Sequence, residues 1–212
     1  MLQVKELKKQ YHKRPVLNGV SFCLPAGVGL GICGDNGSGK STLLRILAQA
    51  EKPDSGDILF GGTSILADKA FVRGNVGYVP QTADLMPELK VSQQLKLWMA
   101  ACGKTGEVPG EIIELLGLET MMSVRAGELS GGMGQRVSIA MALSTQPKIL
   151  IMDEVTAGLD HGYCSRLLDW LEGYMKKGGR IIWCSHHAHE VERLCGSCIH
   201  LGQQLQQAET PV

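Results

Sequence analysis

The chain has 212 residues, 44% of them hydrophobic, and its 21 lysines and arginines balance its 21 aspartates and glutamates. This composition excludes an intrinsically disordered chain, and the neutral charge excludes a protein built mainly to coat nucleic acid. Glycine is unusually frequent: 27 of the 212 residues are glycine, or about one in eight, against a usual share of about 7%. We expect these glycines where the backbone turns sharply or approaches a ligand.

Cysteine usage and the apolar segments bear on the compartment. The seven cysteines mostly stand singly in apolar stretches, which is typical of buried thiols in a reducing compartment. The longest uncharged stretches, 20–34 and 194–208, are shorter than the roughly 20 apolar residues that a membrane-spanning helix needs. We therefore expect a cytoplasmic protein that reaches any membrane through a partner.

The first third of the chain alternates short apolar runs with turn residues. Residues 1–27 predict three short strands, at least partly antiparallel, and the dense apolar run 28–33 predicts a buried strand. Residues 41–50 place leucine and isoleucine on one helical face and predict a helix. Further strands are expected at 57–60 and 74–79, on either side of a turn.

Helical periodicity joined by glycine-rich turns dominates from about residue 83 to 147, which predicts a helical lobe. Apolar runs after this lobe predict strands at 148–152, 180–185 and 197–201. Helices are expected between them, near 164–177 and 189–195. Strands that alternate with helices indicate an α/β fold with a mainly parallel sheet.

These expectations define one α/β domain, which the phosphate-binding motif described below assigns to the P-loop NTPases. Its core comprises 1–82 and 148–202, with an N-terminal antiparallel β subdomain, and the helical lobe of about 83–147 is inserted in it. The glutamine-rich tail 203–212 is expected to be weakly ordered.

The segment 34–41 reads Gly-Asp-Asn-Gly-Ser-Gly-Lys-Ser and fits the phosphate-loop pattern between a strand and a helix. Its glycines let backbone N–H groups converge on phosphate oxygens, and the helix N-terminus adds positive charge. Lys40 would neutralise the outer phosphates and the Ser41 hydroxyl would hold Mg²⁺. The candidate nucleotide-binding residues here are Gly34, Asn36, Gly37, Ser38, Gly39, Lys40, Ser41 and Thr42.

A second element, residues 149–154, is an apolar run that ends in two acids. Asp153 would hold Mg²⁺ beside the phosphate loop, and Glu154 would orient or deprotonate an attacking water. These two motifs together indicate a nucleotide hydrolase or a kinase and do not choose between them.

The segment 129–136 reads Leu-Ser-Gly-Gly-Met-Gly-Gln-Arg and resembles a second anion cradle. Ser130 supplies a hydroxyl, Gly131 and Gly132 expose backbone N–H groups, and a helix is expected from about Gly134. One chain with one phosphate site does not obviously need two cradles. We therefore expect the second cradle to serve the nucleotide of another subunit.

With these motifs in this order, over roughly residues 2–202, the chain resembles the ABC-type ATPases, the nucleotide-binding subunits of ATP-binding-cassette transporters. In that resemblance 34–41 is the Walker A loop, 149–154 is the Walker B strand with its catalytic glutamate, and 129–135 is the signature motif. The remaining matches are Tyr11 as the adenine-stacking aromatic, Gln81 as the Q-loop glutamine, Asp160 in the D-loop and His186 as the switch histidine.

The resemblance implies ATP and Mg²⁺ as ligands and a head-to-tail dimer with a second ABC ATPase domain, identical or homologous. Each ATP would lie between the Walker A loop of one domain and the signature of the other. The contacts from the second domain would be Ser130, Gly131, Gly132, Gln135 and Asp160. Gln81 would sense Mg²⁺ or the γ-phosphate, and His186 would contact the γ-phosphate. Transmembrane permease subunits would hold the protein on the cytoplasmic face of the membrane.

Two departures from the family and several alternatives stay open. Val155 stands where relatives usually have proline, and His161 follows the D-loop where proline is common. The Met-Gly-Gln-Arg ending of the signature resembles that of exporter ATPases. Two alternatives stay open: the ATPase subunit of an importer, and a soluble ATPase of assembly or repair. A kinase or GTPase is disfavoured by the signature. Cys195 and Cys198 have the spacing of metal ligands, although buried strand and helix positions explain them better.

Overall fold

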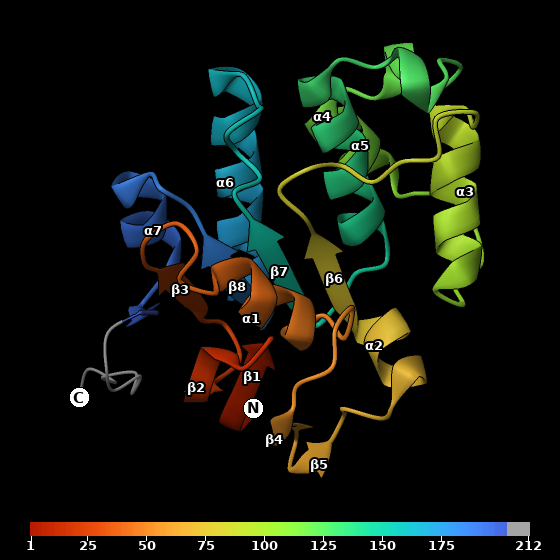
Figure 1. Ribbon diagram of the computed structural model, residues 1–212. Helices are drawn as coiled ribbons and strands as arrows, with labels where there is room; N and C mark the ends of the chain where they lie inside the picture. The colour runs from red at the N-terminus through yellow and green to blue at the C-terminus, as the bar shows by residue number, and fades with distance from the viewer. Residues whose placement is uncertain (203–212) are drawn as a thin grey trace.

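The computed structural model describes residues 1–202, and the predicted weakly ordered tail 203–212 lies outside the described residues. Two sheets form the frame of the molecule (Figure 1): a four-stranded sheet of order β2-β1-β4-β5 and a five-stranded sheet of order β6-β7-β8-β3-β9. The first sheet is antiparallel and the second is parallel. The predicted α/β fold with an N-terminal antiparallel subdomain is therefore confirmed.

The antiparallel sheet is built on a long hairpin of β1 (Leu2–Tyr11) and β2 (Arg14–Leu24). The expectation of three short strands was wrong, because β2 continues through Gly19. Gly19 takes φ +81° and is the extra residue between the pairs Leu7–Val20 and Lys8–Asn18. A bulge of this kind bends a strand without ending it. Two shorter strands complete the sheet, β4 (Ser55–Phe60) and β5 (Thr63–Ser64).

The parallel sheet carries the chemistry-bearing loops at the carboxyl ends of its strands. Strands β7 and β8 are buried along their whole length, as expected for a parallel sheet covered on both faces. Its strands are β3 (Gly29–Cys33), β6 (Val76–Val79), β7 (Ile149–Asp153), β8 (Arg180–Cys184) and β9 (Ser197–His200). The helices that accompany them are α1 (Lys40–Leu47), α6 (His161–Lys176) and α7 (Ala188–Leu194).

The helices between β6 and β7 gather at one side of the parallel sheet, where Figure 1 shows them beyond the end of β6. They are α3 (Val91–Ala101), α4 (Gly110–Leu116) and α5 (Gly131–Ser144), with 3-10 turns at Glu119–Met121 and Ala126–Glu128. Their apolar faces share one core with β7 and β8, because Leu95, Leu116 and Val137 belong to the same buried cluster as Met152 and Trp183. This shared core fixes the position of α5 against the parallel sheet.

Two helix boundaries differ from the sequence-based expectation. Helix α5 begins at Gly131, earlier than expected, because the Ser130 hydroxyl caps it and accepts a hydrogen bond from Met133 N at 3.3 Å. Helix α2 (Lys69–Asn75) occupies the start of the strand expected at 74–79, and it buries no residue. Within residues 1–202, no helix is both long and apolar enough to cross a bilayer.

Candidate active site

The phosphate loop connects β3 to α1. Gly37 and Gly39 take φ +80° and +100°, in the left-handed region that favours glycine. A side chain at Gly39 would also stand 2.9 Å from Val16 Cγ1. The Lys40 ammonium folds over this loop and donates to the carbonyl oxygens of Gly34 at 2.7 Å and Asp35 at 3.1 Å. The lysine ammonium is therefore held against the backbone at the start of the loop.

A hollow of about 640 Å³ opens above this loop. It brings together ten of the predicted site residues, namely Tyr11, Asn36, Gly37, Gly39, Lys40, Ser41, Thr42, Gln81, Glu154 and His186. Gly34 and Ser38 do not line it, and among the described residues the buried Ser38 hydroxyl has no hydrogen-bond partner. Val16 also lines the hollow, although its place in a strand offered no signal of a role in the site.

Glu154 occupies the junction of three distant segments of the chain. Its Oε1 atom lies 2.9 Å from His186 Nε2, and its Oε2 atom accepts a hydrogen bond from Gln81 Nε2 at 2.8 Å. The Glu154 backbone has φ +50°, an uncommon conformation for a residue with a side chain, which costs on the order of 1–3 kcal/mol. The loop backbone is held by a bond from Glu154 N to Cys184 O at 2.8 Å.

The three residues predicted to hold Mg²⁺ line one hollow of about 500 Å³ behind the phosphate loop: Ser41, Gln81 and Asp153. A hydroxyl, an amide and a carboxylate are the oxygen ligands that Mg²⁺ prefers. Cys184, Asp153 and Glu154 form a second group of potential metal ligands. One ligand atom from each of the three lies within 4.8 Å of the others. Burial and the nearby Asp153 raise the pKa of Cys184 to about 12, so its neutral thiol is a poor ligand for this ion.

Within residues 1–202, neither Cys195 nor Cys198 belongs to a group of three potential metal ligands. Burial raises the pKa of Cys195 to about 12 and that of Cys198 to about 11. Both cysteines therefore remain neutral thiols at physiological pH.

The signature residues line a separate hollow of about 500 Å³ that also reaches Gln81 and Glu154. Ser130, Gly131 and Gln135 face this hollow, whereas Gly132 and Asp160 do not. Gly132 packs against the backbone of Gly158, and a side chain there would stand 2.4 Å from its carbonyl oxygen.

Two side chains of this region make structural hydrogen bonds. Gln135 Nε2 donates to Pro80 O at 3.2 Å, which connects the signature helix to the segment that carries Gln81. Asp160 caps α6 by accepting a hydrogen bond from Tyr163 N at 3.0 Å. Among residues 1–202, Tyr11 and the signature residues Ser130, Gly131 and Gln135 line different hollows.

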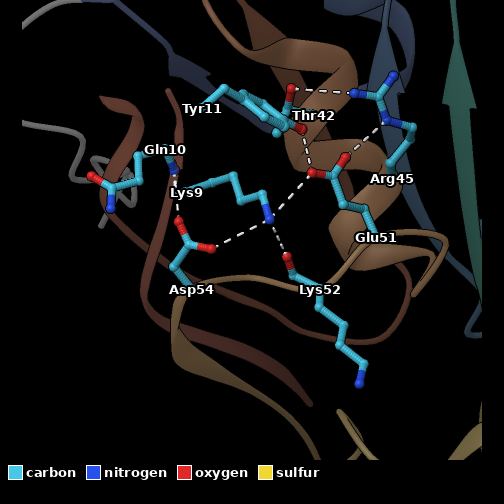
Figure 2. A network of polar contacts seen from close by, with 8 residues as sticks. All are labelled: Lys9, Gln10, Tyr11, Thr42, Arg45, Glu51, Lys52 and Asp54. Carbon is cyan, nitrogen blue, oxygen red and sulfur yellow. Dashed lines mark hydrogen bonds and ion pairs between the residues drawn. The ribbon is translucent and has the colours of Figure 1, made fainter. Parts of the chain in front are cut away.

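Tyr11 is fixed at the rim of the first hollow by a network of charged side chains (Figure 2). Its hydroxyl donates to Glu51, which also accepts a bond from Arg45 Nε at 3.2 Å. Lys9 Nζ lies 3.4 Å from Glu51 and 5.5 Å from the centre of the Tyr11 ring. Burial opposes ionisation, but hydrogen bonds from Tyr11, Lys9 and Arg45 leave the pKa of Glu51 below its usual value. The Tyr11 residue remains 38% exposed, which leaves surface for stacking.

Comparison with known proteins identifies the family of this chain. The sequence profile of the family described as "ABC transporter" matches residues 17–157. The linearmycin resistance ATP-binding protein LnrL of Bacillus subtilis (strain 168) is 36% identical over 199 residues, which cover 92% of this chain and 64% of that protein. The Nod factor export ATP-binding protein I of Rhizobium sp. (strain N33) is 37% identical over 193 residues, with coverage of 89% and 64%.

The chain thus spans about 64% of the length of these curated relatives. A solved structure described as an ATP-binding subunit of an ABC transporter superposes with a TM-score of 0.88 at 30% identity, over 95% of this chain and 85% of that one. The profile covers more than half of the 212 residues. The chain belongs to the ABC transporter family, as the order of its motifs predicts.

Proposed function

We propose that this chain is the ATP-binding and ATP-hydrolysing subunit of a transporter, and that it powers export through separate transmembrane subunits. The observation that carries the proposal is the placement of Glu154 between Gln81 and His186, at the edge of the hollow above the phosphate loop. The export direction rests on relatives whose names refer to Nod factor export and linearmycin resistance.

In this proposal the phosphate loop binds the triphosphate. The backbone from Gly34 to Gly39, with the side chains of Asn36 and Ser38, surrounds the phosphates, and Lys40 and Thr42 add charge and a hydroxyl. The unpartnered buried Ser38 hydroxyl and the left-handed glycines fit such a cradle. Tyr11 offers its ring to the adenine, held in place by Glu51.

Ser41, Gln81 and Asp153 would hold Mg²⁺, which offsets the negative charge of the phosphates when it is bound. Glu154 accepts a proton from the attacking water or orients it, because its carboxylate faces the hollow and is only 17% exposed. His186 holds Glu154 in place and contacts the terminal phosphate. These roles place the chemistry beyond the carboxyl ends of β7 and β8, where open α/β sheets bind ligands.

A second ABC ATPase domain, identical or homologous, would complete each site with its Ser130, Gly131, Gly132, Gln135 and Asp160. The separate hollow that the signature lines supports this arrangement, because it leaves the signature free to face another chain. The helical lobe of about 83–147 would then connect ATP to transmembrane permease subunits on the cytoplasmic face of the membrane.

Two experiments test this function. The purified protein with ATP and Mg²⁺ should release phosphate, and Lys40→Ala should abolish that release. Affinity purification of the tagged chain from a detergent extract should recover a polytopic membrane protein. Recovery of a substrate-binding lipoprotein would reverse the direction to import, and recovery of ribosomes or assembly factors would contradict a role in transport.

A further inference from the structure

One buried acid beside the proposed catalytic site has no role in the family motifs. Glu190, in α7, is 1% exposed. Its Oε2 atom accepts hydrogen bonds from Thr156 Oγ1 at 2.9 Å and from Ser185 Oγ at 2.6 Å. Its Oε1 atom faces Cys164 Sγ at 3.7 Å. Because a buried carboxylate is stabilised only by its partners, these contacts fix the Glu190 side chain.

The two hydroxyls that meet at Glu190 come from the two loops that carry the central pair of the site. Thr156 follows Glu154 by two residues after β7, and Ser185 precedes His186 after β8. The Ser185 hydroxyl also accepts a hydrogen bond from His187 N at 3.0 Å, which shapes the turn around His186. A single carboxylate oxygen therefore joins the loop that carries Glu154 to the loop that carries His186.

The conformation of Glu154 shows why such a connection matters. A left-handed backbone at a residue with a side chain persists only where its surroundings determine it. Besides the contact of its own side chain with His186, the segment that holds Glu154 at φ +50° is tied by the backbone bond from Glu154 N to Cys184 O and by the bond from Thr156 Oγ1 to Glu190. Without the Thr156 hydroxyl bond, this segment loses its connection to α7 and keeps the backbone bond to Cys184 and the contact with His186.

We propose that Glu190 is a positioning residue for the reaction: by binding Thr156 and Ser185 it holds Glu154 and His186 in contact, and it acts on turnover and not on ATP binding. This inference rests on the proposed ATPase function. It predicts that the effect of Glu190 passes through His186, whereas a purely structural role would not depend on that side chain.

Matched pairs of variants separate the hydroxyl bond from packing. Thr156→Val removes the hydroxyl with little change of shape, and Thr156→Ser keeps it. Ser185→Ala and Ser185→Thr form the same pair on the other loop. Glu172→Gln is the control. Glu172 binds Arg193, which lies on α7 together with Glu190, but Glu172 touches neither loop. Glu190→Gln is the direct variant, and the hydroxyl pairs keep the inference testable if that variant fails to fold.

The test measures kcat and KM for ATP hydrolysis in each variant, alone and combined with His186→Ala. We expect Thr156→Val and Ser185→Ala to lower kcat about ten- to hundredfold, since small displacements of reacting groups have effects of that size. The KM of these two variants should stay within about twofold of the value for the unmodified chain. The kcat of Thr156→Ser, Ser185→Thr and Glu172→Gln should stay within the same range. In the His186→Ala background, Thr156→Val should cause no further loss.

Three results would overturn the inference. They are an unchanged kcat in Thr156→Val and Ser185→Ala, a rise in KM with kcat preserved, or the same further loss in the His186→Ala background as in the unmodified chain. Each of these measurements requires that the unmodified chain hydrolyse ATP. If the proposed function were wrong, the unmodified chain itself would show no hydrolysis, so the two failures can be told apart.

Discussion

The Oε1 atom of Glu154 lies 2.9 Å from Nε2 of His186, although the two residues follow different strands of the parallel sheet, β7 and β8. Their side chains differ in exposure, with 17% of Glu154 and 56% of His186 accessible. The histidine is thus the outer member of the pair. The predictions below follow from this geometry and from the loops around it.

Replacement of Lys40 by alanine should weaken ATP binding without unfolding the chain. The Lys40 ammonium bonds to the carbonyls of Gly34 and Asp35 and lines the hollow. Hydrogen bonds to a charged group contribute about 1.5–3 kcal/mol, so we expect the Kd of ATP to rise about ten- to hundredfold. Titration calorimetry measures this change. The exposed Lys177→Ala is the control, and an equal loss in both variants would show that the effect is not local.

Tyr11→Ala should weaken binding of ATP but not of inorganic tripolyphosphate. If the ring stacks on adenine, its removal loses about 1–3 kcal/mol, which is the usual contribution of one stacked base. Tyr11→Phe should keep most of that affinity, because the ring remains and only the hydroxyl bond to Glu51 is lost. Parallel titrations of both ligands test this. A similar loss for tripolyphosphate would contradict an adenine contact.

The two signature glycines should respond to alanine in opposite directions. Alanine normally stabilises a helix relative to glycine by about 0.5–1 kcal/mol. At Gly131 nothing lies within 4 Å of the added carbon, so Gly131→Ala should leave the free energy of unfolding unchanged or raise it. At Gly132 the added carbon would stand 2.4 Å from Gly158 O. Gly132→Ala should therefore lower the free energy of unfolding by about 1–3 kcal/mol. Urea unfolding with a non-thiol reductant measures both, and equal changes would refute the close contact.

Stability should fall as the pH rises from about 9 towards about 12. Burial raises the pKa of Cys184 and Cys195 from 9.0 to about 12, so the folded state keeps protons that the unfolded chain has lost. Each such thiol lowers the free energy of unfolding by up to about 1.4 kcal/mol per pH unit in this window.

Urea unfolding at several pH values measures this slope. Cys195→Ala should reduce it, and the exposed Cys23→Ala should not. A free energy of unfolding that is constant between pH 8.5 and 10.5 would contradict the prediction.

Much of the fold could be predicted because its determinants are local. The buried strands β7 and β8 have dense apolar sequences, and the phosphate loop combines glycines, a lysine and a hydroxyl at fixed spacing. Helix α2 was missed because it buries no residue and so shows no apolar stripe. Strand β2 was divided because a glycine marks both a turn and a bulge, and only pairing with β1 decides between them.

The site was less completely predictable than the fold. Gln81, Glu154 and His186 could be named from their motifs, but their mutual contacts depend on the order of strands in the sheet. Val16 and Glu190 give no signal along the chain. Glu190 lies on a short helix among exposed polar residues, and its burial arises only where Thr156 and Ser185 meet it in the folded protein.

The most direct test of the proposed function is the rate of phosphate release by Glu154→Gln in the presence of ATP and Mg²⁺. The substitution keeps the size of the side chain and removes its basicity. We expect the rate to fall at least about 10²- to 10⁴-fold, the range for loss of a general base, while ATP still binds and the closed dimer accumulates. Turnover close to that of the unmodified chain would contradict the role of Glu154 and the mechanism built on it.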